Sequence, residues 1–406
     1  MLPDYVEQAL RTLTQAGYAA YLVGGCVRDQ LMSRIPKDYD IASNAPIEVF
    51  DRLFDRVIPT GLTHGTVTVL IDGQTIEITR MRADGPYTDR RRPDSVQFLD
   101  DITVDLSRRD FTVNAMAIDG RNGLDVSLAT VLDPFGGQAD LTARLIRAVG
   151  DPGRRFDEDA LRILRAFRFA SVLDFTIEET TLAAALDRCP LLADIAAERV
   201  AAELMSLLCP AQGQSQRLAP QVLAPLMAAG GLTAFGLPAC AARLDGLADL
   251  PSLREVRLSA LVHLCGGNIT KVCVALKTDK ALRGRAAAFG RALAEPSTQS
   301  AAELKRQWQF LPRDLWLPAL DTRRILLDED NTTLAEEIDR ALKEHAPFAI
   351  SDLAIDGEFL KKMGFYGPEI GLVLDWLLAD VFEHPAHNNP EKLALLADSF
   401  KKLQKN

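Results

Sequence analysis

Hydrophobic and polar positions near the start of the chain follow two different periods. Residues 3–16 place Val6, Leu10 and Leu13 three and four positions apart, which predicts an amphipathic helix. The apolar run at 18–25 ends in two glycines and is typical of a strand that enters a tight turn. The segment 38–43 also predicts a short strand. Helix and strand patterns therefore alternate in this part of the chain.

The next segments continue the strand pattern. Two β-branched runs within 63–81 are joined by Asp72-Gly73, which predicts a hairpin. Residues 82–98 are polar and rich in arginine and contain two prolines, so we expect a mobile loop. Residues 114–126 predict a further strand pair that turns near Asn122-Gly123.

After Leu141 the strand patterns end and helical periodicity takes over. It is clearest at 158–173, 198–208, 253–264 and 371–382. The sequence thus predicts an α+β protein, with a mixed sheet and helices in its head and helices alone afterwards. We expect a head at 1–140, a helical neck at 141–206, a helical body at 207–315 and a helical tail at 316–406.

Composition narrows the classes of protein. The 406 residues are 48% hydrophobic and carry a net charge of −10. This excludes a disordered chain and a general nucleic-acid coat, but not an enzyme with a local basic groove. Six scattered cysteines without a CxxC pair fit neither a disulfide scaffold nor a zinc site. With no signal peptide or membrane-length apolar run, we expect a cytoplasmic protein without a membrane partner.

Two acidic residues are the first candidates for chemistry. Asp38 and Asp40 are two positions apart on a predicted strand, so they are expected to share one face. Carboxylates that close repel each other unless a cation lies between them. Mg²⁺ is the natural partner because it binds carboxylate and phosphate oxygens. A solvated pair on a turn is the alternative interpretation.

The surrounding residues favour the metal. Gly24-Gly25 lies between a strand and a helix-like stretch, where backbone N–H groups can approach a phosphate. Arg28 follows within one turn and can bind phosphate oxygens. Glu77, between two apolar strand residues, faces away from the core and is a third candidate carboxylate, with a plain exposed glutamate as the alternative. Together these groups suit nucleotidyl transfer by metal-bound carboxylates.

At this point the sequence resembles a known family. Segments 22–31 and 36–43 are similar to the motif of the polymerase-β-like nucleotidyltransferases, in the class II branch of bacterial CCA-adding tRNA nucleotidyltransferases and poly(A) polymerases. The similarity continues, in the family's order, through 59–69, 108–116, 132–141, 150–170 and 198–204. The resemblance implies a nucleotidyltransferase that uses tRNA with CTP and ATP as substrates. It implies no protein partner.

The motif at 108–116 suggests contacts to the sugar and the phosphates. Arg109 can neutralise triphosphate charge, and Asp110 and Asn114 can hydrogen-bond a ribose hydroxyl. A simple helix N-terminus with a favourable acid is the alternative. In the family this motif is associated with ribonucleotide binding.

The segment 158–168 suggests how a base is chosen. Asp159, Arg162, Arg165 and Arg168 recur every third position, so on one helix Asp159 and Arg162 are neighbours. Cytosine and adenine both present an amino donor beside a bare ring nitrogen. An acceptor at Asp159 and a donor at Arg162 therefore select C and A against G and U. We expect Arg165 and Arg168 to contact phosphate or to position the base, and an exposed ion pair is the alternative.

The product remains open between three related enzymes. The segment 58–71 resembles the CCA-adding type rather than the poly(A) polymerases, and the complete loop at 82–98 disfavours addition of CC alone. Addition of A alone stays an alternative, as does poly(A) synthesis. An RNA-binding protein with an inactive head is the non-enzyme alternative. His384 and His387 form an HxxH pair beside Pro385, which we interpret as a loop.

Overall fold

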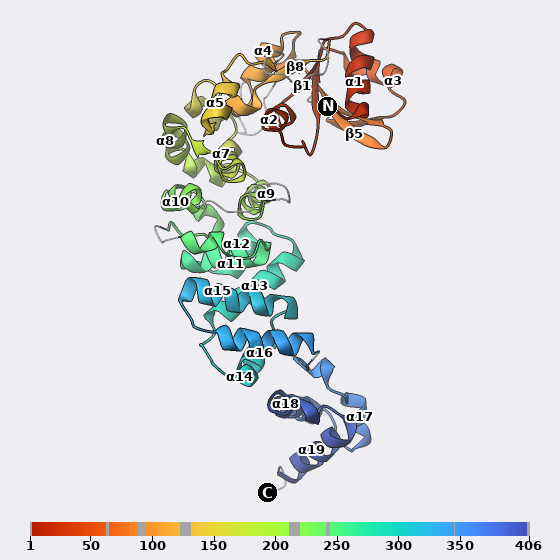
Figure 1. The fold of residues 1–406 in the computed structure, drawn as a ribbon, viewed down its shortest axis with the longest axis vertical. Coiled ribbons are helices and arrows are strands. Elements are labelled where there is room, and N and C mark those ends of the chain that lie inside the picture. The colour runs from red at the N-terminus through yellow and green to blue at the C-terminus, as the bar shows by residue number, and fades with distance from the viewer. Residues whose placement is uncertain are drawn as a thin grey trace. The chain divides into compact units, whose positions relative to one another are not determined.

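The computed structural model describes residues 2–61, 65–85, 87, 95–121, 131–210, 220–240, 244–344 and 346–403. The chain divides into two compact units, Met1–Ala241 and Ala242–Asn406, which are drawn in Figure 1. Each unit is described by itself below. The finer division into head, neck, body and tail stays a prediction.

The first unit opens with a mixed α and β region. Its elements are α1 (Asp4–Gln15), β1 (Ala20–Val23), α2 (Gly25–Leu31), β2 (Asp40–Ser43), α3 (Phe50–Leu53), β3 (Val57–Gly61), β4 (Thr66–Ile71), β5 (Gln74–Arg80), β6 (Arg82–Asp84), β7 (Val96–Phe98), α4 (Ile102–Ser107), β8 (Ala117–Asp119) and β9 (Val131–Leu132). The helices that follow are α5 (Gly137–Ala143), α6 (Pro152–Glu158), α7 (Leu161–Leu173), α8 (Glu179–Asp187), α9 (Ala197–Leu208) and α10 (Pro220–Ala228).

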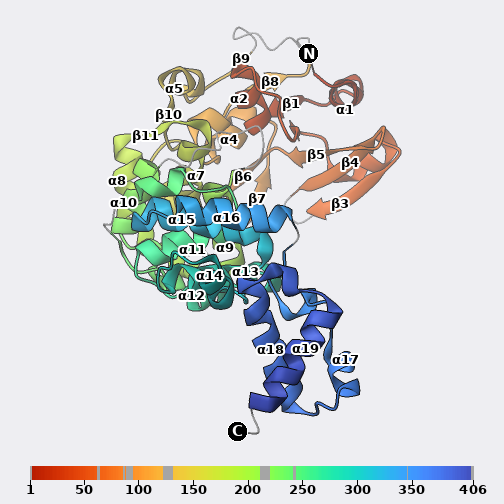
Figure 2. The ribbon, with the colours of Figure 1, turned by 60° about the horizontal axis from the view of Figure 1, so that its bottom comes forward.

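Seven strands form one mixed sheet in the order β3-β4-β5-β2-β1-β8-β9. Most neighbours are antiparallel, but β2 and β5 run parallel, with Asp40 opposite Glu77. The hairpin of β4 and β5 turns at Asp72 and Gly73, both with positive φ (49° and 77°), as the Asp-Gly pair predicts. Figure 2 shows this hairpin beside β3. The predicted α+β class is confirmed.

One face of this sheet is covered by α1. Val6, Leu10 and Leu13 are all fully buried, in a cluster that also contains Leu22 of β1 and Ile41 of β2. Burying an aliphatic side chain of this size contributes about 1.5–3 kcal/mol. Tyr21 and Val23 alternate with Leu22 and belong to a cluster on the other face. The core therefore fixes β1 and β2, the two strands that carry the site.

Several details differ from the sequence predictions. The strand predicted at 38–43 begins only at Asp40, and Asp38 lies in a bend before it. The ends of the predicted loop 82–98 form a two-stranded antiparallel ladder, β6 with β7. Two short parallel strands, β10 (Leu145–Ile146) and β11 (Thr176–Ile177), interrupt the region predicted to be wholly helical. The predicted turn at Asn122-Gly123 and residues 86 and 88–94 lie outside the described residues.

All regular secondary-structure elements in the described residues of the second unit are helices. Its helices are α11 (Arg254–Leu264), α12 (Ile269–Ala275), α13 (Lys280–Ala294), α14 (Ala301–Gln307), α15 (Trp316–Leu327), α16 (Thr332–Lys343), α17 (Gly357–Lys362), α18 (Pro368–Glu383) and α19 (Pro390–Leu403). Near its C-terminal end, α17, α18 and α19 enclose a core that includes Leu360, Leu377 and Leu393 (Figure 2).

No single helix among the described residues has both the length and the hydropathy that a membrane span requires. The pair α11 and α12 meets them only when taken together, and these two helices are bent by 114° where they join.

Candidate active site

Gly24 occupies the turn from β1 into α2 in a backbone conformation that favours glycine. Its φ of +81° is a conformation that side-chain-bearing residues rarely adopt. A Cβ atom at this position would lie 2.8 Å from Nη1 of Arg109 and 3.9 Å from Oδ2 of Asp40. The side chains of Arg109 and Asp40 therefore both lie close to the Cα of Gly24. The structure thus brings together three of the predicted site residues.

Three predicted carboxylates lie around the start of β2. Asp40 is the first residue of the strand, and Glu77 is its register partner on β5. Glu77 is exposed, as expected for an acid between two core-facing residues. Asp38 is also exposed, but it precedes the strand, so the predicted sharing of one strand face is wrong. Asp38 reaches the same region from the bend instead.

Electrostatics show that these acids act on one another. Burial, the largest effect, raises the pKa of Asp40 to about 6, while Arg109 lowers it and the charges of Glu77 and Asp38 raise it further. The nearby arginine thus compensates only part of the negative charge. A set of hard oxygen donors with excess negative charge fits a divalent cation.

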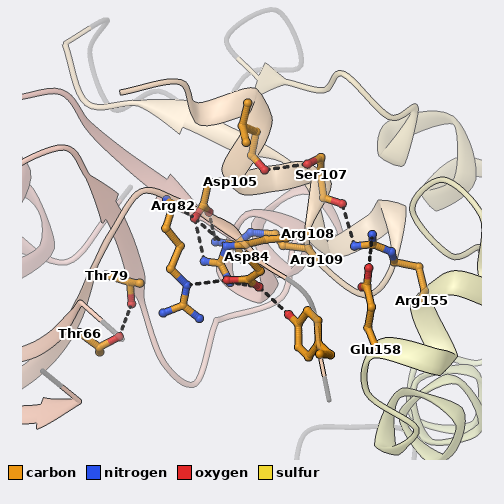
Figure 3. Close-up of polar contacts among 12 residues, drawn as sticks. Thr66, Thr79, Arg82, Asp84, Asp105, Ser107, Arg108, Arg109, Arg155 and Glu158 are labelled. Atoms are coloured by element: carbon orange, nitrogen blue, oxygen red, sulfur yellow. Dashed lines mark hydrogen bonds and ion pairs between the residues drawn. The ribbon is translucent and has the colours of Figure 1, made fainter. Parts of the chain in front are cut away.

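Arg109 is held from one side by a buried acid. Its Nη2 donates to Oδ2 of Asp105 at 3.3 Å, while Arg108 donates to Oδ1 of the same residue at 2.7 Å (Figure 3). Burial alone raises the pKa of Asp105, but Arg108 and Arg109 outweigh it and hold the pKa below its usual value. The Nε of Arg109 is buried without a hydrogen-bond partner. This guanidinium therefore keeps donor capacity beside Gly24.

A chain of hydrogen bonds joins four other predicted residues. Arg28 Nη1 donates to Asn114 Oδ1 at 2.6 Å, and Asn114 Nδ2 donates to Asp110 Oδ1 at 3.1 Å. Arg165 of α7 donates to Asp110 Oδ2 through Nη2 at 2.6 Å. Burial works against the charge of Asp110, but chiefly Arg165 and Asn114 hold its pKa at about 2. This chain ties α2 to α7 through the motif at 108–116.

Three arginine side chains lie close to the aromatic ring of Phe169. The guanidinium carbons of Arg28, Arg165 and Arg168 lie 5.3, 5.1 and 4.1 Å from its ring centroid. Arg168 Nε also donates to Glu203 of α9 at 2.6 Å, and Arg165 lies 3.6 Å from the same carboxylate. Arg165 and Arg168 are therefore paired within the protein.

Asp159 and Arg162 do not share one helix, contrary to the prediction. Helix α6 ends at Glu158, Asp159 is extended (φ −142°, ψ 101°), and α7 begins at Leu161. Asp159 Oδ2 instead accepts from Arg199 at 3.2 Å. Arg162 donates to Glu158 at 3.0 Å and to the carbonyl of Arg108 at 2.9 Å. The acceptor and the donor are thus fixed by separate partners.

Four residues that support the site escaped the sequence analysis. All four lie within the segments 150–170 and 198–204, which resemble the family. That resemblance could have indicated them, whereas no charge pattern does. They are Glu158, Phe169, Arg199 and Glu203.

A cavity of about 670 Å³ lies beside this part of the site. It is bordered by the end of β6, where Asp84 accepts a hydrogen bond from Tyr87 at 2.6 Å, and by α6. Figure 3 shows Asp84, Arg155 and Glu158 around this region. The lining residues are Asp84, Gly85, Tyr87, Asp151, Arg154, Asp157, Glu158 and Arg188. The cavity therefore lies beside the Glu158–Arg162 pair rather than over Asp38 and Asp40.

Two family models match the first unit. Residues 20–147 match the model described as "Poly A polymerase head domain". Residues 174–216 match the model described as "Probable RNA and SrmB- binding site of polymerase A". The first match contains the Gly24 turn, the three carboxylates and the chain of hydrogen bonds up to Asn114.

Similar whole proteins are known from several bacteria. The chain is 36% identical to the CCA-adding enzyme of Lactobacillus gasseri over 408 residues, which cover 96% of each chain. It is 35% identical to that of Streptococcus sanguinis over 92% of each chain. With the enzyme of Levilactobacillus brevis the identity is 48%, but this alignment spans 53% of the chain and only 54% of that relative's length. The stronger similarity thus covers about half of that relative.

A solved structure extends the comparison to the fold. The CCA-adding enzyme of Bacillus stearothermophilus in complex with CTP aligns over 100% of both chains, with a TM-score of 0.80 and 30% identity. The Thermotoga maritima CCA-adding enzyme complexed with tRNA aligns over 97% of the chain, with a TM-score of 0.65 and 20% identity. The second likeness concerns the fold alone.

Proposed function

The chain belongs to the family of CCA-adding enzymes, which are nucleotidyltransferases, and from this premise we propose that it adds C, C and A to the 3′ end of tRNA. The substrates are CTP, ATP and tRNA, and pyrophosphate is released. One observation carries the proposal. Asp40 and Glu77 stand in register on parallel strands, with Asp38 and Arg109 beside them and Gly24 close to the side chains of Asp40 and Arg109.

We propose that Asp38 and Asp40 hold the catalytic metal and that Glu77 is the third carboxylate of the centre. Family membership implies a divalent cation, and we assign it as Mg²⁺ because the donors are carboxylate oxygens. When bound, such an ion favours the deprotonated 3′-hydroxyl and neutralises charge on the phosphates. The tRNA 3′-oxygen loses its proton to solvent and forms a bond to the α-phosphorus, and the bond from that phosphorus to the bridging oxygen of the β-phosphate breaks, which releases pyrophosphate. No side-chain nucleophile is needed.

The basic groups of the first unit divide the contacts to the triphosphate. We assign Gly24, Gly25 and Arg109 to phosphate oxygens, because the glycines leave room for close approach and Arg109 has an unpartnered buried Nε. Arg28 is already bound to Asn114 and Asp29, so it serves the phosphates from a fixed position. The Asp110–Asn114 pair then lies in position to recognise the ribose.

We propose that base choice rests on Asp159 as acceptor and Arg162 as donor. Arg199 binds Asp159 and Glu158 binds Arg162, so Asp159 and Arg162 do not form an ion pair with each other. The amino group and bare ring nitrogen of cytosine or adenine complement this pair, whereas uracil and guanine do not. Arg165 and Arg168 position the neck through Asp110, Glu203 and Phe169.

The remaining assignments follow from the substrate. We propose that the helical segments after residue 141 hold the tRNA, that no protein partner is required, and that the protein acts in the cytoplasm. A reduced compartment agrees with six scattered cysteines that show no paired spacing.

An incorporation assay tests this function. Three matched tRNAs, ending before CCA, after C and after CC, are each given Mg²⁺ with CTP, ATP or both. Complete CCA addition to all three, followed by arrest, is the expected result. Extension of only the tRNA that ends in CC, and only by A, would identify an A-adding enzyme. Continued A addition would indicate a poly(A) polymerase, and binding without incorporation would indicate an inactive head.

A further inference from the structure

A second cluster of metal-ligand side chains lies at the end of α18, in the unit that does not contain the carboxylates described above. Asp380, His384 and His387 place one ligand atom each within 4.8 Å of the others. Among the described residues, this is the one set of three His, Cys, Asp or Glu side chains that meets this condition. The HxxH spacing alone indicates a loop, but Asp380, one helical turn earlier, supplies a third donor.

The geometry directs both imidazoles at one carboxylate. His387 Nδ1 lies 2.7 Å from Asp380 Oδ2, and His384 Nδ1 lies 3.6 Å from Asp380 Oδ1. The two imidazole rings are stacked, with centroids 4.8 Å apart and planes 18° apart. A single Asp–His contact would suffice to cap the helix. The second imidazole brings another donor nitrogen to the same carboxylate, so three donor atoms of two chemical kinds converge on one place.

The backbone around the cluster is held in place. The short helix η10 (Pro385–His387) follows α18 directly. Immediately after it, Asn388 donates to the carbonyl of Asp352 at 2.9 Å and accepts from the N–H of Ala354 at 2.8 Å. Asn389 then caps the following helix by accepting from Lys392 N–H at 2.9 Å. Hydrogen bonds thus hold the turn that carries the two histidines. Within the cluster, only the His384 side chain is largely exposed (59%).

We propose that Asp380, His384 and His387 bind a divalent transition-metal ion of the zinc class. Two imidazole nitrogens and one carboxylate oxygen suit Zn²⁺, Co²⁺ or Ni²⁺, whereas Mg²⁺ and Ca²⁺ prefer oxygen ligands alone. Metal–ligand bonds of about 2.0–2.2 Å need the donor atoms about 3.4 Å apart. Asp380 Oδ2 and His387 Nδ1 are closer than this, at 2.7 Å, so an ion binds only when these two side chains move apart and His384 turns towards them. Water completes the coordination on the open side.

A bound ion would join the end of α18 to the turn that leads into α19. All three ligands lie at the end of α18 or in the turn after it, so the ion would stabilise this end of the helix rather than form a second catalytic centre. This inference does not rest on the proposed nucleotidyl transfer, and either can fail without the other.

Zn²⁺ binding to the full-length protein tests the site, with Mg²⁺ in excess so that the carboxylate centre is occupied. The wild type is expected to take up one equivalent of Zn²⁺ that H384Q and H387Q lose, while H263Q, which alters the exposed histidine of α11, retains it. Zn²⁺ should also raise the melting temperature of the wild type but not of H384Q. Because His384 is mostly exposed, its replacement leaves the fold intact.

Two results would overturn the proposal. One is a Zn²⁺ stoichiometry and affinity in H384Q equal to those of the wild type. The other is a Co²⁺ complex of the wild type whose visible absorption does not change when His384 and His387 are both replaced by glutamine.

Discussion

Asp40 stands where opposing electrostatic influences meet. Burial and the charges of Glu77 and Asp38 raise its pKa, and Arg109 lowers it. This balance costs stability in the absence of a cation, because three acids face one guanidinium. Side chains that destabilise one another in this way are best explained by the charge they are arranged to bind.

Removing either carboxylate that we assign to the metal should therefore abolish incorporation. D38A and D40A are expected to lower nucleotide addition by about a thousandfold or more, since metal stabilisation is worth several kcal/mol. Binding of tRNA should persist in both variants. D51A, at an exposed acid of α3, is the matched control and should keep full activity. Incorporation by D38A and D40A at the wild-type rate would refute the metal assignment.

Arg162, the donor that we propose for base selection, is held in place by Glu158 and by the carbonyl of Arg108. R162A should reduce the preference for CTP over UTP by roughly 10–100-fold, because an unsatisfied polar group costs about 1–3 kcal/mol. R11A, at an exposed arginine of α1, should leave the preference unchanged. The measurement is the ratio of kcat/KM for the two nucleotides. An unaltered ratio in R162A would place base choice elsewhere.

Asp110 makes folding sensitive to acid. Its folded pKa of about 2 lies below the ordinary value of about 4, so the unfolded chain takes up a proton first as the pH falls. The stabilisation from Asp110, on the order of 2 kcal/mol, is present above pH 4 and is lost as the pH falls towards 2. Urea unfolding should show the wild type and D110N differing most at neutral pH and converging near pH 2. Parallel pH curves would contradict this.

Among the helices and strands, those elements that depend on neighbouring residues could be predicted from the sequence. The period of α1 and the Asp-Gly turn between β4 and β5 depend on neighbouring residues, so the sequence indicates them directly. The start of β2 at Asp40 was not predictable, because it depends on pairing with β1 and β5. At the break between α6 and α7, Asp159 accepts from the N–H of Leu161 and from Arg199, and only the second partner, forty positions away, is beyond the reach of local patterns. Candidate site residues could be named from motifs, but their partners could not.

Close packing at the start of α5 gives a prediction at this scale. A Cβ atom at Gly137 would lie 2.3 Å from the carbonyl oxygen of Thr112, which precedes the site residue Asn114. G137A should therefore destabilise the protein by roughly 1–3 kcal/mol, as overpacking does. G284A, in the interior of α13 with open space around it, should stabilise by about 0.4–1 kcal/mol instead. Equal unfolding midpoints in urea for the two variants would contradict the packing argument.

For the whole molecule, the net charge of −10 bears on how tRNA is held. An acidic protein binds a polyanion only through local groups of lysine and arginine, so tRNA affinity should be set by a limited number of phosphate contacts. Not every lysine contributes. Lys401, for example, donates to the carbonyls of Met363 and Gly364 at 3.2 Å and so closes the end of α17.

The salt dependence of tRNA binding distinguishes lysines that contact phosphate from lysines that stabilise the fold. The logarithm of the association constant for tRNA should fall linearly with the logarithm of salt concentration, by about 0.7–0.9 for each phosphate neutralised. K401A should keep the wild-type slope and lose thermal stability, because its ammonium is bound to backbone carbonyls. Duplex DNA of similar length should bind much more weakly at the same salt concentration. Binding that is insensitive to salt, or equal affinity for duplex DNA, would mean that shape or bases rather than local phosphate contacts hold the tRNA.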